Sequence, residues 1–120
     1  MEKTTAQRIA TLNDEFRSTV GLPRFDPAVR GLIVCTAGIT ALPPQEQIEI
    51  WFAVAQFNAF SENNDPHGEH DFGVLECEVA GRVFWKIDYY ADDTMEWVSK
   101  DPADPMKCFR VLTILLASEY

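Results

Sequence analysis

The sequence lacks the paired cysteines of disulfide-rich secreted proteins and the long apolar runs of membrane proteins. Three cysteines, Cys35, Cys77 and Cys108, are spread over 120 residues without a Cys-x-x-Cys pair, which argues against a disulfide framework and a zinc-finger spacing. We expect them to be reduced and mostly buried. The apolar run at 111–117 is far shorter than the roughly 18–20 residues of a membrane span, and the N-terminus lacks the apolar core of a signal peptide. We therefore expect a cytoplasmic protein with no membrane partner.

Basic residues are also scarce. Ten Lys and Arg face nineteen Asp and Glu, so the net charge is −9. The excess lies within residues 62–104, which hold twelve acids and three bases. An acidic surface repels phosphate backbones, so we expect no direct nucleic-acid binding. Such a surface suits a basic protein, a metal ion or simple solubility.

Motifs of the common enzyme classes are missing as well. The chain contains no glycine-rich phosphate loop, no Gly-x-Ser-x-Gly and no His-Glu-x-x-His. Apolar residues make up 47% of the chain, which is enough to fold a protein of this length. We expect a single domain over residues 1–120 and favour a protein that is not an enzyme and has no cofactor.

Periodicity predicts three elements in the first half. Residues 5–20 form an amphipathic helix, with Thr4 as N-cap and Gln7 completing a capping box. Residues 31–36 are a short apolar run typical of a buried strand. Residues 44–60 predict a helix that is apolar around most of its circumference. Such a helix is buried on more than one side, or one of its faces meets a partner.

The second half predicts a hairpin and a third strand. Residues 71–80 and 82–90 alternate as strands, and a three-residue loop at 80–82 places Glu76 opposite Lys86. The segment 108–118 fits a strand or a helix, and we favour a strand because it completes the sheet. The fold class is α+β in the order α-β-α-β-β-β, with a largely antiparallel sheet of three to four strands packed against two helices.

The alternation leaves open which face of this sheet the helices cover. Lys86, Asp88 and Tyr90 lie on the face opposite the expected core set. If the helices leave that face free, its aromatic residues are exposed beside charges, which is typical of an interaction site. If the helices cover it, Lys86 and Asp88 form a buried pair.

The segment 61–73, SENNDPHGEHDFG, is the strongest candidate for a metal or catalytic site. Nitrogen and oxygen donors of this kind bind divalent metals such as zinc. The candidate ligands are Asp65, His67, Glu69, His70 and Asp71, with Asp88 as a possible base. However, Pro66 and Gly68 disfavour the helix that would place both histidines on one face. We therefore favour an acidic loop over a metal site.

Residues 91–107 form a long acidic segment with two Asp-Pro pairs. Loops of this length in compact domains are often functional. Trp97 in its middle either plugs the core from outside or serves as a contact anchor, and we favour the plug because large aromatic residues are usually buried.

The stretches TAGITALPPQEQ, ENNDPHGEHDFG, RVFWKIDYY, DPADP and RVLTILLASEY together resemble a family of short proteins of unknown function. Its members are carried mostly by proteobacteria, often on plasmids and other mobile elements. The family typically has a Tyr-like residue at the position of His67, which argues further against a histidine pair. No activity is established for the family. Its genomic setting implies accessory roles, among them inhibition of host defence nucleases of the CRISPR or restriction type.

These observations lead to one favoured hypothesis and two alternatives. We expect a protein-binding module whose acidic surface contacts a basic protein surface, such as that of a nucleic-acid-binding complex. The expected contact residues are Glu62, Asp65, Glu69, His70, Asp71, Asp88, Tyr90, Asp92, Asp93, Glu96 and Trp97. The alternatives are a small metal-dependent enzyme using the 61–71 loop, and a domain that oligomerises through the helix at 44–60. The sequence leaves the oligomeric state open.

Overall fold

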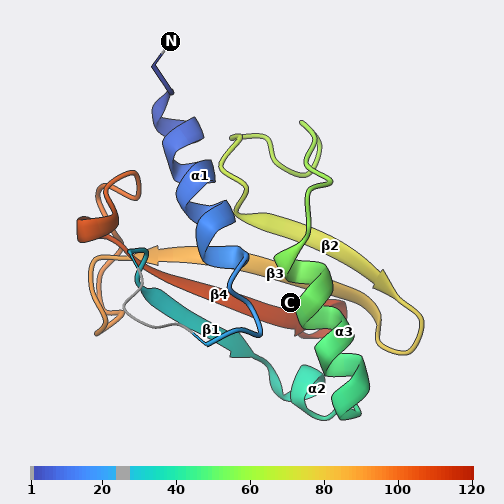
Figure 1. Cartoon of the computed structure of the whole chain (residues 1–120). Helices are drawn as coiled ribbons and strands as arrows, with labels where there is room; N and C mark the ends of the chain where they lie inside the picture. The colour runs from blue at the N-terminus through green and yellow to red at the C-terminus, as the bar shows by residue number, and fades with distance from the viewer. Residues whose placement is uncertain (1, 24–27) are drawn as a thin grey trace.

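The computed structural model describes residues 2–23 and 28–120. Its regular elements are α1 (Thr5–Arg17), β1 (Gly31–Cys35), α2 (Ala37–Thr40), α3 (Pro44–Ala55), β2 (Phe72–Cys77), β3 (Gly81–Tyr90), the 3₁₀ turn η1 (Pro105–Lys107), β4 (Phe109–Leu116) and the 3₁₀ turn η2 (Ala117–Glu119) (Figure 1). None of the helices in these ranges is long and apolar enough to cross a membrane.

The four strands form one mixed sheet in the order β1-β4-β3-β2. β1 runs parallel to β4, whereas the pairs β4–β3 and β3–β2 are antiparallel. The predicted α+β class and the strand at the C-terminal end are therefore confirmed. Two helices, α2 and α3, and the β2–β3 hairpin separate β1 in sequence from its partner β4.

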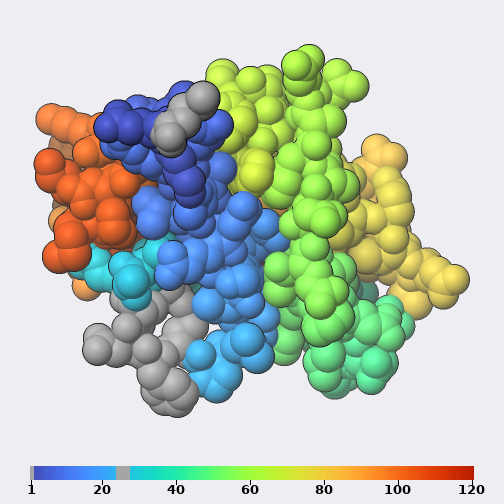
Figure 2. Space-filling view, turned by 45° about the horizontal axis from the view of Figure 1, so that its top comes forward, coloured from blue at the N-terminus to red at the C-terminus, as the bar shows by residue number. Residues whose placement is uncertain are grey.

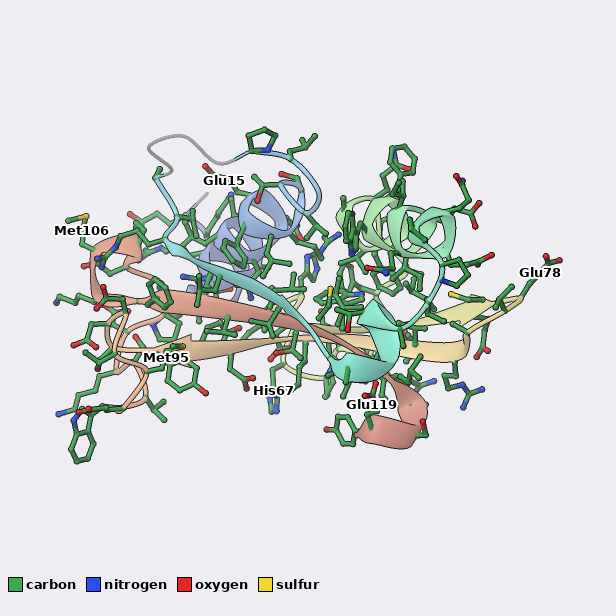
Figure 3. All side chains as sticks on the ribbon, turned by 90° about the horizontal axis from the view of Figure 1, so that it is seen from below. Glu15, His67, Glu78, Met95, Met106 and Glu119 are labelled. Carbon is green, nitrogen blue, oxygen red and sulfur yellow. The ribbon has the colours of Figure 1, made fainter. Side chains whose placement is uncertain are left out.

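The helices α1 and α3 cover one face of the sheet (Figures 1 and 3). Phe16 and Val54 from the helices pack with Trp85, Leu112 and Ile114 from the strands, and all five side chains are fully buried. The opposite face carries neither of these helices, and η2 adjoins only one end of it (Figure 3). We call this opposite surface the open face. Its strand residues include Leu32, Val34, Phe72, Val74, Phe84, Lys86, Asp88, Tyr90 and Thr113.

α1 begins as predicted but ends earlier. The Thr4 side chain accepts from the Gln7 N–H, and the Gln7 side chain accepts from the Thr4 N–H, so the capping box is present. The helix ends at Arg17 rather than at residue 20, because the next residues close tighter turns. Val20 N–H donates to the Arg17 carbonyl oxygen, and Gly21 then adopts a φ of +83°, a conformation suited to glycine.

α3 also ends before the predicted residue 60. The Arg17 guanidinium donates to the carbonyl oxygens of Val54 at 2.9 Å and Ala55 at 3.3 Å, which satisfies the end of the helix. Beyond that end, Phe57 and Phe60 turn their rings edge-on to Trp85. Packing against the indole thus replaces the last predicted turn of helix.

The predicted hairpin register is wrong, although the predicted loop length and core face are right. Cys77 pairs with Gly81 and Glu76 with Arg82, so the three-residue loop is 78–80. Gly81 has a φ of +75° directly after this loop, a conformation that glycine adopts without strain. Glu76 binds Arg82 Nε at 2.8 Å instead of lying opposite Lys86. The shift is an even number of residues, so the same side chains still face the core.

Candidate functional site

Polar residues of the 61–71 loop form hydrogen bonds within the loop and to α1. Asp65 is buried, and its Oδ1 accepts from the N–H groups of Glu69 and His70, both at 3.2 Å. His70 adopts a φ of +58°, and its Nδ1 lies 3.0 Å from each carboxylate oxygen of Asp14 in α1. Its ring stacks on Phe60 with a centroid distance of 3.9 Å. The polar groups of Asp65 and His70 therefore form hydrogen bonds within the protein.

A buried polar chain connects the same loop to the other acidic segment. Arg110 of β4 donates from Nε to Asn13 Oδ1 and from Nη2 to the Pro102 carbonyl oxygen, both at 2.6 Å. Asn13 Nδ2 donates to the Tyr89 hydroxyl oxygen and to the Glu69 carbonyl oxygen. The Tyr89 hydroxyl donates in turn to Glu69 Oε1 at 2.9 Å. α1 and the strands thus join residues 61–71 to residues 91–107.

Burial shifts the pKa values of residues in and beside this chain of hydrogen bonds. It raises the pKa of Tyr89 far above its usual value, so the hydroxyl remains a neutral donor. It lowers the pKa of Arg110, although that side chain stays charged because the usual value is so high. Burial, followed by the charge of Glu69, raises the pKa of the neighbouring Asp71 carboxyl. Burial thus keeps Tyr89 a neutral donor in these hydrogen bonds, whereas Arg110 remains charged.

The structure does not bring the candidate metal ligands together. Within residues 2–23 and 28–120, no group of three or more His, Cys, Asp and Glu side chains could hold a metal ion. Figure 3 shows His67 on the side of the sheet away from the helices, whereas His70 contacts Asp14 of α1. The two histidines of the loop are therefore directed to different surroundings.

The cysteines do not suggest a nucleophile. Cys108 is buried, and Cys35 and Cys77 are half-buried. Burial raises the pKa of all three thiols. A raised pKa reduces the thiolate fraction that attacks a substrate.

The acidic segment 91–107 is ordered by its own hydrogen bonds. Ala91 N–H donates to the Trp97 carbonyl oxygen at 2.8 Å, and Ser99 N–H donates to the Tyr89 carbonyl oxygen at 3.1 Å. Asp92 accepts from both the N–H and the hydroxyl of Thr94, which lowers the pKa of Asp92. Ser99 Oγ donates to the Lys107 carbonyl oxygen at 2.8 Å. The segment therefore presents its side chains from a fixed backbone.

The predicted plugging role of Trp97 is wrong. Its side chain is 73% exposed, and that of Val98 is 74% exposed. Val29, Cys108 and Arg110, by contrast, are buried. The indole therefore projects into solvent beside the exposed residues Asp92, Asp93 and Glu96, which leaves the contact-anchor interpretation.

The open face fits the uncovered alternative. Lys86 Nζ lies 2.6 Å from Asp88 Oδ2, and these side chains are 37% and 43% exposed, so the pair is not buried. Phe84 packs against both Phe72 and Tyr120 with centroid distances of 5.4 Å. The face is thus a partly exposed apolar surface with a balanced ion pair near its middle.

The fold sorts the predicted contact residues into three groups. Glu62, Asp92, Asp93, Glu96 and Trp97 are exposed. Asp88 and Tyr90 are half-buried on the open face, and Asp65, Glu69, His70 and Asp71 are buried or half-buried near α1. Figure 2 shows the 61–71 loop and the 91–107 segment on opposite sides of the N-terminal half of α1. The exposed group is therefore the one available to a partner.

Asn13 and Arg110, which connect the two acidic segments, are not among the residues predicted from the sequence. Both are fully buried. A signal existed for each: Asn13 falls on the apolar side of α1 beside Phe16, and Arg110 shares the alternating core positions of β4 with Leu112 and Ile114. On α3, the helix of the oligomerisation alternative, Ile48 and Phe52 are exposed.

Comparisons with known proteins support the family resemblance at its coarser level. No curated protein and no solved structure matches the chain. Residues 35–119 match a family described as protein of unknown function, DUF3768. The match covers α2, α3 and all four strands apart from most of β1. The chain therefore belongs to the DUF3768 family.

Proposed function

We propose that the protein is a non-enzymatic binding module that docks a basic protein surface with the exposed part of its 91–107 segment. The observation that carries this proposal is Trp97, an exposed indole on an ordered backbone among carboxylates. Ordering the loop before binding reduces the entropy lost on association. Tryptophan is enriched among residues that dominate binding energy.

The charge of the chain supports a basic partner. Asp92, Asp93 and Glu96 are exposed in the same segment as Trp97, and the chain as a whole carries −9. Complementary charge raises the rate of association and selects against acidic partners. Glu62 in the 61–71 loop is exposed as well.

The kind of partner follows from the resemblance to short proteins of mobile elements. Proteins that act on nucleic acids offer basic channels, and an acidic protein that occupies such a channel blocks it by competing with phosphate. We therefore propose a host defence nuclease, of the CRISPR or restriction type, as the partner. On this proposal the module acts as an inhibitor in the cytoplasm.

The test is affinity capture from a host lysate followed by binding measurements with the purified captured protein. We expect binding that weakens as salt rises, because salt screens exposed charges. Trp97→Ala should reduce affinity by about tenfold or more, and the triple variant Asp92→Lys, Asp93→Lys, Glu96→Lys should abolish binding.

A matched control separates local from overall charge. Glu46, Glu49 and Glu78 line a cleft between α3 and the β2–β3 hairpin, and their reversal to lysine changes the net charge by the same amount. This control should keep most of its affinity. Binding that is insensitive to salt and to both Trp97 and the 91–107 charges would contradict the proposal.

A further inference from the structure

β2 forms one edge of the sheet, at the opposite end of the strand order from β1 (Figure 1). Its neighbour is β3, with which it pairs over Phe72–Cys77. Just before β2, the Ile87 N–H donates to the Asp71 carbonyl oxygen at 2.8 Å, so these two residues form a hydrogen-bonded pair. In an antiparallel ladder the odd-numbered residues of β2 then direct their N–H and C=O groups to β3, and the even-numbered residues direct theirs outward.

The outward groups of β2 are free to bind another strand. Residues 56–80, which contain β2 and the loops on both sides of it, are described without a gap. Within the described chain, the outward N–H and C=O groups of Val74 and Glu76 have no hydrogen-bond partner. β2 reads FGVLEC and contains neither lysine nor proline, which often protect an edge strand. This edge can therefore accept one more strand.

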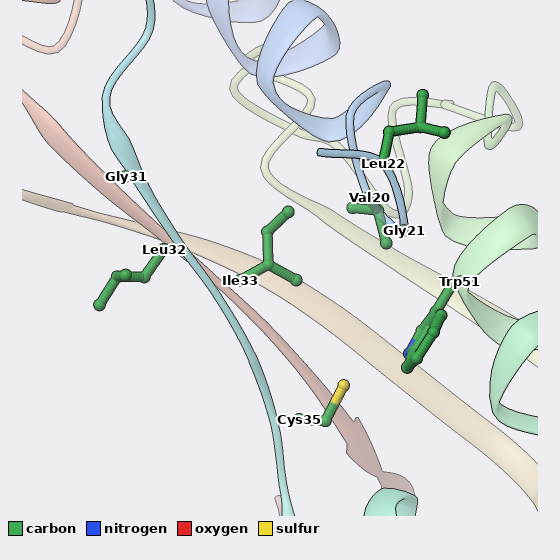
Figure 4. A pocket seen from close by; sticks show the side chains of 8 residues that line it. All are labelled: Val20, Gly21, Leu22, Gly31, Leu32, Ile33, Cys35 and Trp51. Atoms are coloured by element: carbon green, nitrogen blue, oxygen red, sulfur yellow. The ribbon is translucent and has the colours of Figure 1, made fainter. Parts of the chain in front are cut away.

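Two hollows adjoin α3, and they differ in charge. The first has a volume of about 490 Å³, and none of the described residues that line it is charged. Figure 4 shows around it the side chains of Val20, Ile33, Cys35 and Trp51. The second is the cleft between α3 and the β2–β3 hairpin, with a volume of about 450 Å³. Its lining includes four carboxylates, those of Glu46, Glu49, Glu76 and Glu78.

The acidic cleft lies at the edge formed by β2. Cys77 and Val79 line it from β2 and from the loop that follows, and Ile50 lines it from α3. The Cys77 side chain packs against the core, on the helix side of the sheet. Side chains that an added strand directs to the same side therefore enter the cleft, where Glu46 and Glu49 approach from α3.

The charge of the cleft is mostly unbalanced. Glu76 pairs with Arg82, whereas the other three carboxylates form no ion pair within the described chain. Burial, followed by the charges of Glu46, Glu76 and Glu49, raises the pKa of the Cys77 thiol. The negative potential thus reaches the strand itself. Lysine or arginine side chains complement such a potential.

The other side of β2 offers apolar contacts. Phe72 and Val74 are half-buried on the open face, and the ring centroid of Phe72 lies 5.4 Å from that of Phe84. A neighbouring strand places its Cβ atoms about 5 Å from those directly opposite. Apolar residues of an added strand would therefore cover Phe72 and Val74.

We propose that β2 binds an extended basic segment of another protein as the fifth strand of a sheet that has four. The segment alternates basic and apolar residues, because successive side chains of a strand point to opposite faces. Its basic side chains enter the acidic cleft, and its apolar side chains pack on Phe72 and Val74. Backbone hydrogen bonds to Val74 and Glu76 provide affinity, and the side-chain positions provide specificity.

Charge distinguishes this partner from a second copy of the chain. Two copies joined at β2 bring two acidic clefts together, and each chain carries −9. A basic segment neutralises the cleft instead. The site is also separate from the 91–107 segment, which follows the other end of β3. Binding at the two sites can therefore be tested independently.

A synthetic peptide of about eight alternating lysine and valine residues, long enough to span β2, serves as the probe. Fluorescence anisotropy measures its binding to the full chain. The triple variant Glu46→Lys, Glu49→Lys, Glu78→Lys should weaken binding by about tenfold or more. The matched variant Asp92→Lys, Asp93→Lys, Glu96→Lys should bind like the wild type, as should Trp97→Ala, so this site and the proposed partner binding fail or succeed separately.

Amide hydrogen exchange tests strand addition directly. In the wild-type chain, the peptide should slow exchange of the Val74 and Glu76 amides by about tenfold or more, and the Glu96 amide should be unaffected. Val74→Pro removes an outward N–H but no hydrogen bond of the ladder, and should abolish binding. Circular dichroism shows whether each variant is folded.

A control peptide with the same residues in two blocks, all lysines before all valines, has equal charge but no alternation. It should bind much more weakly. Absence of binding by the alternating peptide, or equal binding by the block peptide, would overturn the inference. Binding that leaves the Val74 and Glu76 amides unprotected would do the same. So would protection of these amides in the free chain that grows with protein concentration, since it assigns the edge to a second copy.

Discussion

Asn13 and Arg110 are 97 positions apart in the chain, yet their fully buried side chains meet at 2.6 Å between Oδ1 and Nε. Arg110 also bonds the Pro102 carbonyl oxygen and lies over the Tyr89 ring at 5.3 Å. Arg110 thereby links the 91–107 segment to β4 and to α1. We therefore expect the loss of Arg110 to lower stability.

Arg110→Met should destabilise the protein by about 2–4 kcal/mol, because Asn13 and the Pro102 carbonyl lose their buried donor. Urea unfolding measures the change. Arg82→Met removes an exposed pair with Glu76 and should cost no more than about 1 kcal/mol. Equal effects of the two substitutions would contradict a stabilising role for the buried hydrogen bonds of Arg110.

Glu119→Gln should lower the melting temperature at neutral pH. The Glu119 carboxylate accepts from Thr36, the Gly38 N–H and the Leu116 N–H, and these bonds lower its pKa from 4.5. A lowered pKa in the folded state stabilises the protein above the unfolded value, and that stability is lost as the pH falls through the folded value. The difference between wild type and variant should therefore vanish in acid. A gap that persists there would assign the effect to packing.

Asp71→Asn should act in the opposite direction. Burial and the charge of Glu69 raise the Asp71 pKa above 3.8, so ionisation of this carboxyl disfavours the folded state. The cost develops as the pH rises from 3.8 through the raised pKa. We expect the variant to be the more stable protein at pH 7 and to match the wild type at the acid end. Thermal unfolding at several pH values measures both limits.

Trp97→Ala should change the free energy of unfolding by no more than about 0.5 kcal/mol, because the exposed side chain contributes little packing. Trp85→Ala, which empties the centre of the core, should cost about 3–5 kcal/mol. Urea unfolding of both variants makes the comparison. A large loss of stability for Trp97→Ala would mean that the indole packs against the protein after all.

The sequence predicted those features that depend on local chemistry. The Thr4 capping box, the start of α3 near Pro44 and the alternation of the hairpin strands follow from neighbouring residues, and each is present. The fold class followed from the order of these elements. The family resemblance is confirmed only as membership of a family of unknown function.

Features that depend on distant partners were not predictable in the same way. Arg17 of α1 donates a hydrogen bond to a carbonyl oxygen at the end of α3. No pattern within residues 44–60 predicts this contact. The predicted hairpin register was wrong because side-chain alternation is identical in registers that differ by an even number of residues. In the observed register Gly81, with a φ of +75°, directly follows the loop. Trp97 was assigned to the core because large aromatic residues are usually buried, whereas this one is exposed.

The place of β4 in the sheet has a consequence for synthesis of the chain. β4 is the last strand in sequence, and it lies between β1 and β3. While the ribosome is still making residues 109–116, β1 has no strand to pair with and the β2–β3 hairpin stands alone. A two-stranded hairpin is only marginally stable in water. The sheet therefore assembles late, when these residues have emerged and can join the two halves.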